Sequence, residues 1–149
     1  IPVIAHAITW LKKEGIEASY VCCIYATAPF LSPNDLQIGQ QLLKSSGADY
    51  AFSVTSYPFP IQRAIRITDA QRIQMFQPEC FATRSQDLEE AWHDAGQFYW
   101  GSAEAWLQHK TIFAQNSSPV CLPRYRVQDI DTPEDWVRAE WMFKAMHKL

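Results

Sequence analysis

The stretch "YVCCIYATAPFLSPNDL" (residues 20–36) decides the expected fold, because an apolar run stops at a loop of small residues and a helix start follows. Residues 20–25 are too short for a helix and too apolar for a half-exposed strand. They suit a strand covered on both faces, as in a parallel sheet. In open parallel sheets ligands bind at the carboxyl ends of the strands, so the loop at 26–29 is a candidate pocket rim.

A helix is predicted directly after this loop. Ser32 can act as the N-cap, Pro33 fits the first helical position, and Asp35 places an acid in the first turn. We expect the helix to run to about Ser46 and to end at Gly47.

The rest of the chain alternates between helical and strand patterns. We expect helices over 2–14, 102–110 and 133–147, strands over 20–25, 49–57, 96–101 and 119–124, and a β-hairpin formed by 63–68 and 72–77. The last helix places Val137, Trp141 and Ala145 on one stripe. This order predicts a single α/β domain over 1–149, with a mostly parallel sheet and an inserted β element.

Composition excludes several classes of protein. The 149 residues are 48% hydrophobic and 19% charged, with a net charge of −3, so a basic nucleic-acid footprint is absent. No apolar run is long enough to span a bilayer, and no signal-peptide pattern appears. The four cysteines lack a CxxC spacing, so we expect free thiols in a cytoplasmic setting.

Asp129 and Asp131 are the first candidates for chemistry. Two acids that are two residues apart in an extended segment face the same way, so both carboxylates could bind one Mg²⁺. The alternative is that Asp131 or Thr132 caps the last helix. The two roles are compatible, because one residue suffices for the cap.

Two further segments could bind a ligand. Arg84, before a short acidic segment, could clamp a phosphate or carboxylate, or could pair with a neighbouring acid on the surface. In the aromatic segment 92–100, Gln97 and Tyr99 offer an amide and a hydroxyl to a sugar or base, although Phe98 and Trp100 suit core packing. His93–Asp94 resembles an acid–base pair, but no nucleophile accompanies it. No glycine-rich phosphate loop occurs in the chain.

Four segments together resemble one family, the cytidylyltransferases that activate sialic acid, Kdo and pseudaminic acid. "ATAPFLSPNDL" (26–36) is similar to the family's "PTSPLR…DI" segment, and "RSQDL" (84–88) to "RxQDLP". "HDAGQFYWG" (93–101) is similar to "NGAIY", and "DIDTPEDWVRAE" (129–140) to "DIDTxxDW". Tyr25 and Ala95 replace a glutamine and an asparagine of the sialic acid enzymes, which favours the pseudaminic acid branch.

The resemblance implies a fold and a reaction. The fold would be three-layered and nucleotidyltransferase-like (GT-A or Rossmann-like). The enzyme would transfer CMP from CTP to a nonulosonic acid, an acidic nine-carbon sugar, and release pyrophosphate. The roles that it implies are metal binding by Asp129 and Asp131, which would hold Mg²⁺, and substrate binding by Tyr25, Thr27, Ala28, Arg84, Gln86, Gln97 and Tyr99.

The same resemblance implies an incomplete chain. Family members begin with a strand and a basic loop that binds the CTP triphosphate, and neither is present here. We therefore expect an N-terminally truncated, C-terminal portion that is inactive alone and forms homodimers through exposed apolar surface. Two alternatives stay open: a glycosyltransferase with a D-x-D metal site, and a non-catalytic domain that only binds or assembles.

Overall fold

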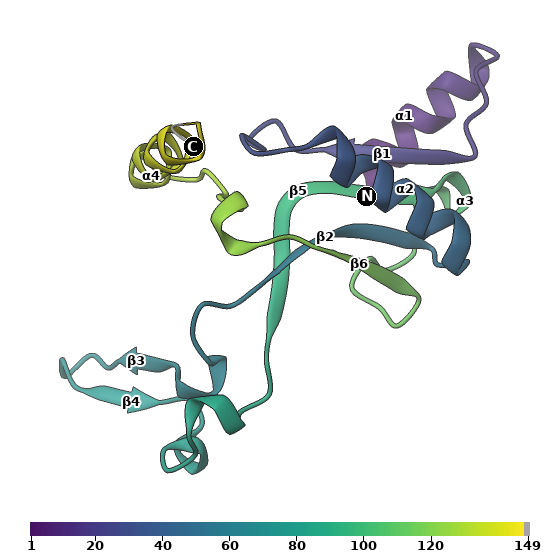
Figure 1. The fold of residues 1–149 in the computed structure, drawn as a ribbon. Coiled ribbons are helices and arrows are strands. Elements are labelled where there is room, and N and C mark those ends of the chain that lie inside the picture. Colours follow the sequence, from purple (N-terminus) through teal and green to yellow (C-terminus); the bar gives the residue numbers. More distant parts are fainter. Residues whose placement is uncertain (148–149) are drawn as a thin grey trace.

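The computed structural model describes residues 1–147 and has an α/β architecture (Figure 1). The helices are α1 (Pro2–Lys13), α2 (Pro33–Ser46), α3 (Ala103–Leu107) and α4 (Pro133–Met146). The strands are β1 (Tyr20–Ile24), β2 (Tyr50–Ser56), β3 (Ile65–Ile67), β4 (Ile73–Met75), β5 (Trp92–Ser102) and β6 (Ser117–Cys121). Every expected helix and strand is present, so the patterns identified the elements correctly.

The main sheet is mixed, and the expectation of a mostly parallel sheet is wrong. Its order is β1-β5-β2-β6, with β5 antiparallel to both neighbours and only β2 and β6 parallel. The reason lies in residues 57–91, which leave the sheet after β2 and return at the same end of that strand, where Tyr57 N donates to Ala91 O. A chain that re-enters the sheet beside a strand, at the end where that strand finished, must run antiparallel to it, whereas a parallel neighbour requires a crossover.

Helices pack on both faces of this sheet. On one face, Trp100 Nε1 donates to Leu36 O of α2 at 3.0 Å, and Phe98 lies beside it. On the other face, Trp106 of α3 and Ile8 of α1 belong to one buried cluster with Tyr50. Strand β1 lies at the edge of the sheet and is only partly covered, so the expectation that it is buried on both faces is also wrong.

The helix starts follow the sequence signals. The Ser32 hydroxyl accepts from Asn34 N, and Gly47 adopts φ +67° where α2 ends. At α4, Thr132 and Asp135 form a reciprocal capping box. Helix α4 buries only Ala139, and the stripe of Val137 and Trp141 is exposed. No helix within the described residues is long and apolar enough to cross a membrane.

Residues 57–91, which include β3 and β4, form an arm that projects away from the main sheet (Figure 1). Strands β3 and β4 pair with each other, from Ile65–Met75 to Ile67–Ile73. Their apolar side chains are largely uncovered, since Ile67 is 70% and Ile73 74% exposed. The expected hairpin is therefore confirmed, and it lies outside the hydrophobic core.

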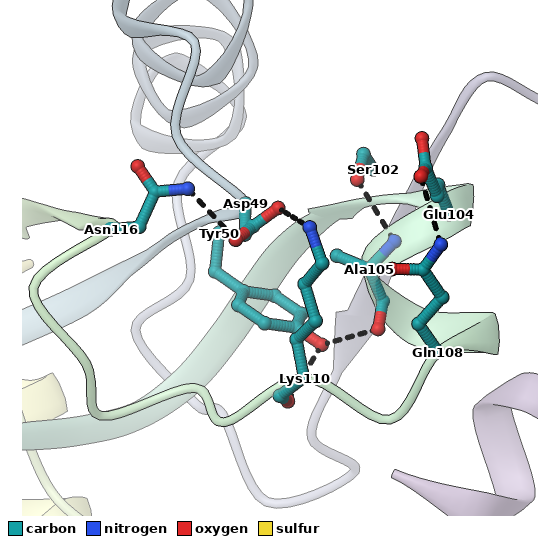
Figure 2. A network of polar contacts seen from close by, with 8 residues as sticks. All are labelled: Asp49, Tyr50, Ser102, Glu104, Ala105, Gln108, Lys110 and Asn116. Carbon is teal, nitrogen blue, oxygen red and sulfur yellow. Dashed lines mark hydrogen bonds and ion pairs between the residues drawn. The ribbon is translucent and has the colours of Figure 1, made fainter.

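A polar network joins the far end of the sheet to the loop after α3 (Figure 2). The Lys110 ammonium donates to Asp49 Oδ1 at 2.7 Å, and Asn116 Nδ2 donates to Asp49 Oδ2 at 2.8 Å. The Tyr50 hydroxyl lies 3.0 Å from both Ala105 O and Lys110 O. The hydrogen bonds from Lys110 and then Asn116 lower the pKa of Asp49.

We predict that Asp49→Asn lowers the melting temperature at neutral pH and that this effect disappears in acid. A carboxyl with a lowered pKa adds stability that is present above its ordinary pKa of about 3.9 and is lost as the pH falls through the lowered value. Thermal melts from neutral pH to below about pH 4 measure the difference. Glu79→Gln, on an exposed arm residue, is the control. A difference that persists unchanged into acid would contradict this account.

Candidate active site

A cleft of about 710 Å³ opens at one end of the strands of the main sheet. The parallel strands β2 and β6 both end there, and β5 begins there because it runs in the opposite direction. The loop between β6 and α4 also lines the cleft and contributes Asp129 and Asp131. The lining residues are Thr55, Ser56, Pro58, His93, Asp94, Ala95, Arg124, Tyr125, Val127, Gln128, Asp129, Asp131, Asp135, Arg138 and Met142.

Gly96 lies next to the Asp129 carboxylate. This glycine has φ +62°, and a Cβ added to it would lie 3.4 Å from Asp129 Cγ. Asp129 Oδ1 also accepts from Ile130 N at 3.1 Å. That distance is an ordinary van der Waals contact, so it is the positive φ, which L side chains rarely adopt, that favours glycine at this position beside Asp129.

The helix cap uses the backbone N–H of Asp131 but neither of the two candidate carboxylates. Thr132 caps α4, and Asp135 completes the box by accepting from Thr132 N and Thr132 Oγ1. The hydrogen bond from the Thr132 hydroxyl contributes most to lowering the pKa of Asp135, and the bond from the Thr132 backbone N–H lowers it further. The carboxylates of Asp129 and Asp131 take no part in the cap, and Asp129 keeps Oδ2 beside the Oδ1 that accepts from Ile130 N.

The acids of the cleft do not by themselves enclose a cation. Within residues 1–147, no group of three or more His, Cys, Asp and Glu side chains is arranged to hold a metal ion. The oxygens of Asp129 and Asp131 are nevertheless the hard donors that Mg²⁺ prefers. Magnesium commonly uses one or two carboxylates and takes its other ligands from water and phosphates. The donor set therefore fits Mg²⁺ in that mode of binding.

A second hollow, of about 610 Å³, lies beside α1 on the other side of Asp94. Tyr25 and Tyr99 line it with ring centroids 5.3 Å apart, and the Tyr99 hydroxyl donates to Asp94 Oδ2. Burial first, and then Asp94, raise the pKa of Tyr99. Because Asp94 lines both cavities, it joins the hollow to the cleft that contains Asp129.

The other predicted site residues lie outside both cavities. Thr27 and Ala28 occupy the turn after β1, where Ala28 O accepts from Leu31 N. Arg84 and Gln86 are exposed on the arm. Gln97 is only 1% exposed, and its amide donates to a backbone carbonyl on the loop after β6 at 2.6 Å. The fold thus brings together Tyr25 with Tyr99, and Asp129 with Asp131.

Sequence patterns did not predict several residues that line the two cavities. Phe113 closes the hollow from a loop without periodicity and stacks on Phe52, with centroids 5.3 Å apart. Arg124 and Arg138 line the acidic cleft, and no local pattern links them to it. His93 does not pair with the Asp94 carboxylate, since its Nδ1 lies 2.9 Å from the backbone oxygen of that residue.

The chain is homologous to cytidylyltransferases over nearly its whole length. A pseudaminic acid cytidylyltransferase of Campylobacter jejuni serotype O:23/36 is 38% identical over 97% of this chain and 62% of its own length. The enzyme of the same name from serotype O:2 of that species is 38% identical over 98% of the chain and 63% of its own length. These matches confirm the resemblance and its pseudaminic acid branch.

A more distant relative carries the other expected sugar in its name. N-acylneuraminate cytidylyltransferase B of Danio rerio is 27% identical over 83% of this chain and 29% of its own length. No protein-family model matches the chain. The chain thus spans less than two thirds of the length of the Campylobacter relatives, which therefore contain parts with no counterpart in these 149 residues.

Proposed function

We propose that this chain forms part of a cytidylyltransferase that transfers CMP from CTP to a nonulosonic acid and releases pyrophosphate. The observation that carries the proposal is the 38% identity to pseudaminic acid cytidylyltransferases over 97% of the chain. The cleft supports it, since carboxylates and guanidinium groups lie together where strands β2 and β6 end. The fold, by the same homology, would be nucleotidyltransferase-like.

In this proposal Asp129 and Asp131 hold Mg²⁺ in the cleft. A bound Mg²⁺ would neutralise negative charge that develops on the phosphates during transfer. Asp131 and Asp129 both line the cleft, and neither carboxylate is used by the neighbouring cap. Arg124 and Arg138 place positive charge at the same cleft, where an anionic substrate would be attracted.

The hollow would take the sugar. Tyr25 and Tyr99 present large rings and one buried hydroxyl, and Phe113 adds apolar surface. Pseudaminic acid carries a methyl terminus and a second acylamino group where sialic acid carries hydroxyls. An apolar wall therefore suits pseudaminic acid better. The same proposal includes five substrate-binding residues that line neither cavity: Thr27, Ala28, Arg84, Gln86 and Gln97.

The test is product analysis with the complete enzyme. CTP and pseudaminic acid should give CMP-sugar and pyrophosphate in equal amounts. Sialic acid should give the same products with a lower kcat/KM, by roughly a hundredfold, because an apolar lining rejects an added hydroxyl only modestly. Hydrolysis or transfer from a sugar nucleotide without use of CTP would favour a D-x-D glycosyltransferase. Binding without turnover would favour a non-catalytic domain.

We also propose that the arm binds a second copy of the chain. The two-stranded β3–β4 hairpin buries none of its own residues, and an isolated hairpin is marginally stable in water. Its exposed isoleucines would be covered at a symmetric interface. Light scattering measures the mass in solution, and a monomer at all concentrations would contradict the proposal.

A further inference from the structure

Strand β5 contains a large bulge beside both cavities. Two steps along β2, from Phe52 to Val54, are matched by five steps along β5, from Tyr99 to Asp94. The Ser53 hydroxyl fills the irregularity by accepting from the backbone N–H groups of residues 97 and 98 at 3.3 and 3.2 Å. Gly96 lies inside the bulge with φ +62°, a conformation that glycine adopts without strain.

The bulge changes which side chains of β5 meet. Residues five apart in a regular strand point to opposite faces. Here the extra residues turn Asp94 to the side of Tyr99, and the Tyr99 hydroxyl donates to Asp94 Oδ2. Phe52 stacks on the Tyr99 ring at 5.5 Å and Tyr25 lies at 5.3 Å, so the ring is held between neighbours and its hydroxyl has a set direction.

We propose that Asp94 positions Tyr99 so that its oxygen can only accept a hydrogen bond from the ligand. The hollow would therefore select a group that donates, such as the N–H of an acylamino group or a sugar hydroxyl. This inference rests on the proposed function, and it names which part of the acidic sugar enters the hollow.

The numbers of hydrogen-bond donors and acceptors on Tyr99 and Asp94 support the selection of a donating ligand group. A tyrosine hydroxyl has one hydrogen, and Tyr99 directs it to Asp94. An ionised carboxylate has no hydrogen to give, so a ligand carboxylate placed here would face two acceptors. The sugar carboxylate must then point away from Tyr99. Arg124 and Arg138, in the cleft that shares Asp94 with the hollow, offer it a favourable partner.

The test measures the binding of pseudaminic acid and of CTP separately, by calorimetry with the complete enzyme. Asp94→Ala should raise the Kd for pseudaminic acid by about tenfold or more and leave the Kd for CTP within about twofold. Tyr99→Phe should change the two Kd values in the same way. The double variant should bind pseudaminic acid with the same Kd as Tyr99→Phe alone, because both substitutions remove one interaction. Asp94→Asn should restore part of the affinity, because its amide oxygen still accepts from Tyr99. Asp69→Ala, on an exposed acid of the arm, is the matched control.

The outcomes separate this inference from the proposed function. Equal losses for both ligands, or fully additive losses in the double variant, would show a merely structural role for Asp94 and overturn the inference. If the wild-type enzyme binds the sugar but makes no CMP-sugar, the proposed function is wrong. The Kd values of the Asp94 variants would still decide whether Asp94 positions Tyr99. Wild-type enzyme that does not bind the sugar would overturn both.

Discussion

Asp131→Asn is expected to reduce the turnover of the complete enzyme by at least about a hundredfold without lowering its melting temperature. Removing one carboxylate from a magnesium site lowers the stabilisation of charge in the transition state, which is worth several kcal/mol. The Asp131 carboxylate takes no part in the α4 cap, so folding has little need of its charge. Steady-state kinetics at saturating CTP and a thermal melt measure the two effects.

The chain supplies a matched control for this prediction at Asp135, four residues away. Asp135 completes the capping box, so Asp135→Asn should lower the melting temperature and reduce turnover far less. If Asp131→Asn keeps both its turnover and its melting temperature, the magnesium assignment is wrong. A loss of both properties would assign Asp131 a structural role instead.

Trp106→Ala is expected to lower the free energy of unfolding by about 3–5 kcal/mol, as for other buried aromatic truncations. Trp106 is 1% exposed, and it packs edge-on against Tyr50 with ring centroids 4.8 Å apart. Its Nε1 donates to Val21 O at 3.2 Å, which links α3 to strand β1. The substitution therefore creates a cavity and leaves a carbonyl group without its partner. Denaturant titration measures the change.

The matched control is Trp141→Ala on helix α4. Trp141 is 67% exposed, so the same truncation there should change the free energy of unfolding by no more than about 0.5 kcal/mol. Equal effects at Trp106 and Trp141 would show that α3 does not anchor the sheet as described. A large loss at Trp141 alone would show that α4 is covered by other protein in solution.

Local signals were sufficient to predict which elements form, both ends of α2 and the start of α4, whereas β5, α3 and β6 have other bounds than expected. The Ser32 and Thr132 caps and the left-handed Gly47 are interactions among residues close in sequence, so a short window contains all their causes. The hairpin of the arm is predictable for the same reason. The resemblance to cytidylyltransferases also depended on short segments and was confirmed by relatives 38% identical over nearly the whole chain.

Strand order and the composition of the cavities were decided only by tertiary structure. An apolar strand suits either direction of pairing, and β5 is antiparallel to β2 because the arm returns the chain to the end of β2 where it left the sheet. The contact of Asp94 with Tyr99 depends on a bulge that Ser53 of another strand fills. Phe113 and Arg138 come to their cavities from distant segments. Such pairings depend on contacts between residues far apart in sequence, and no local pattern of side chains encodes them.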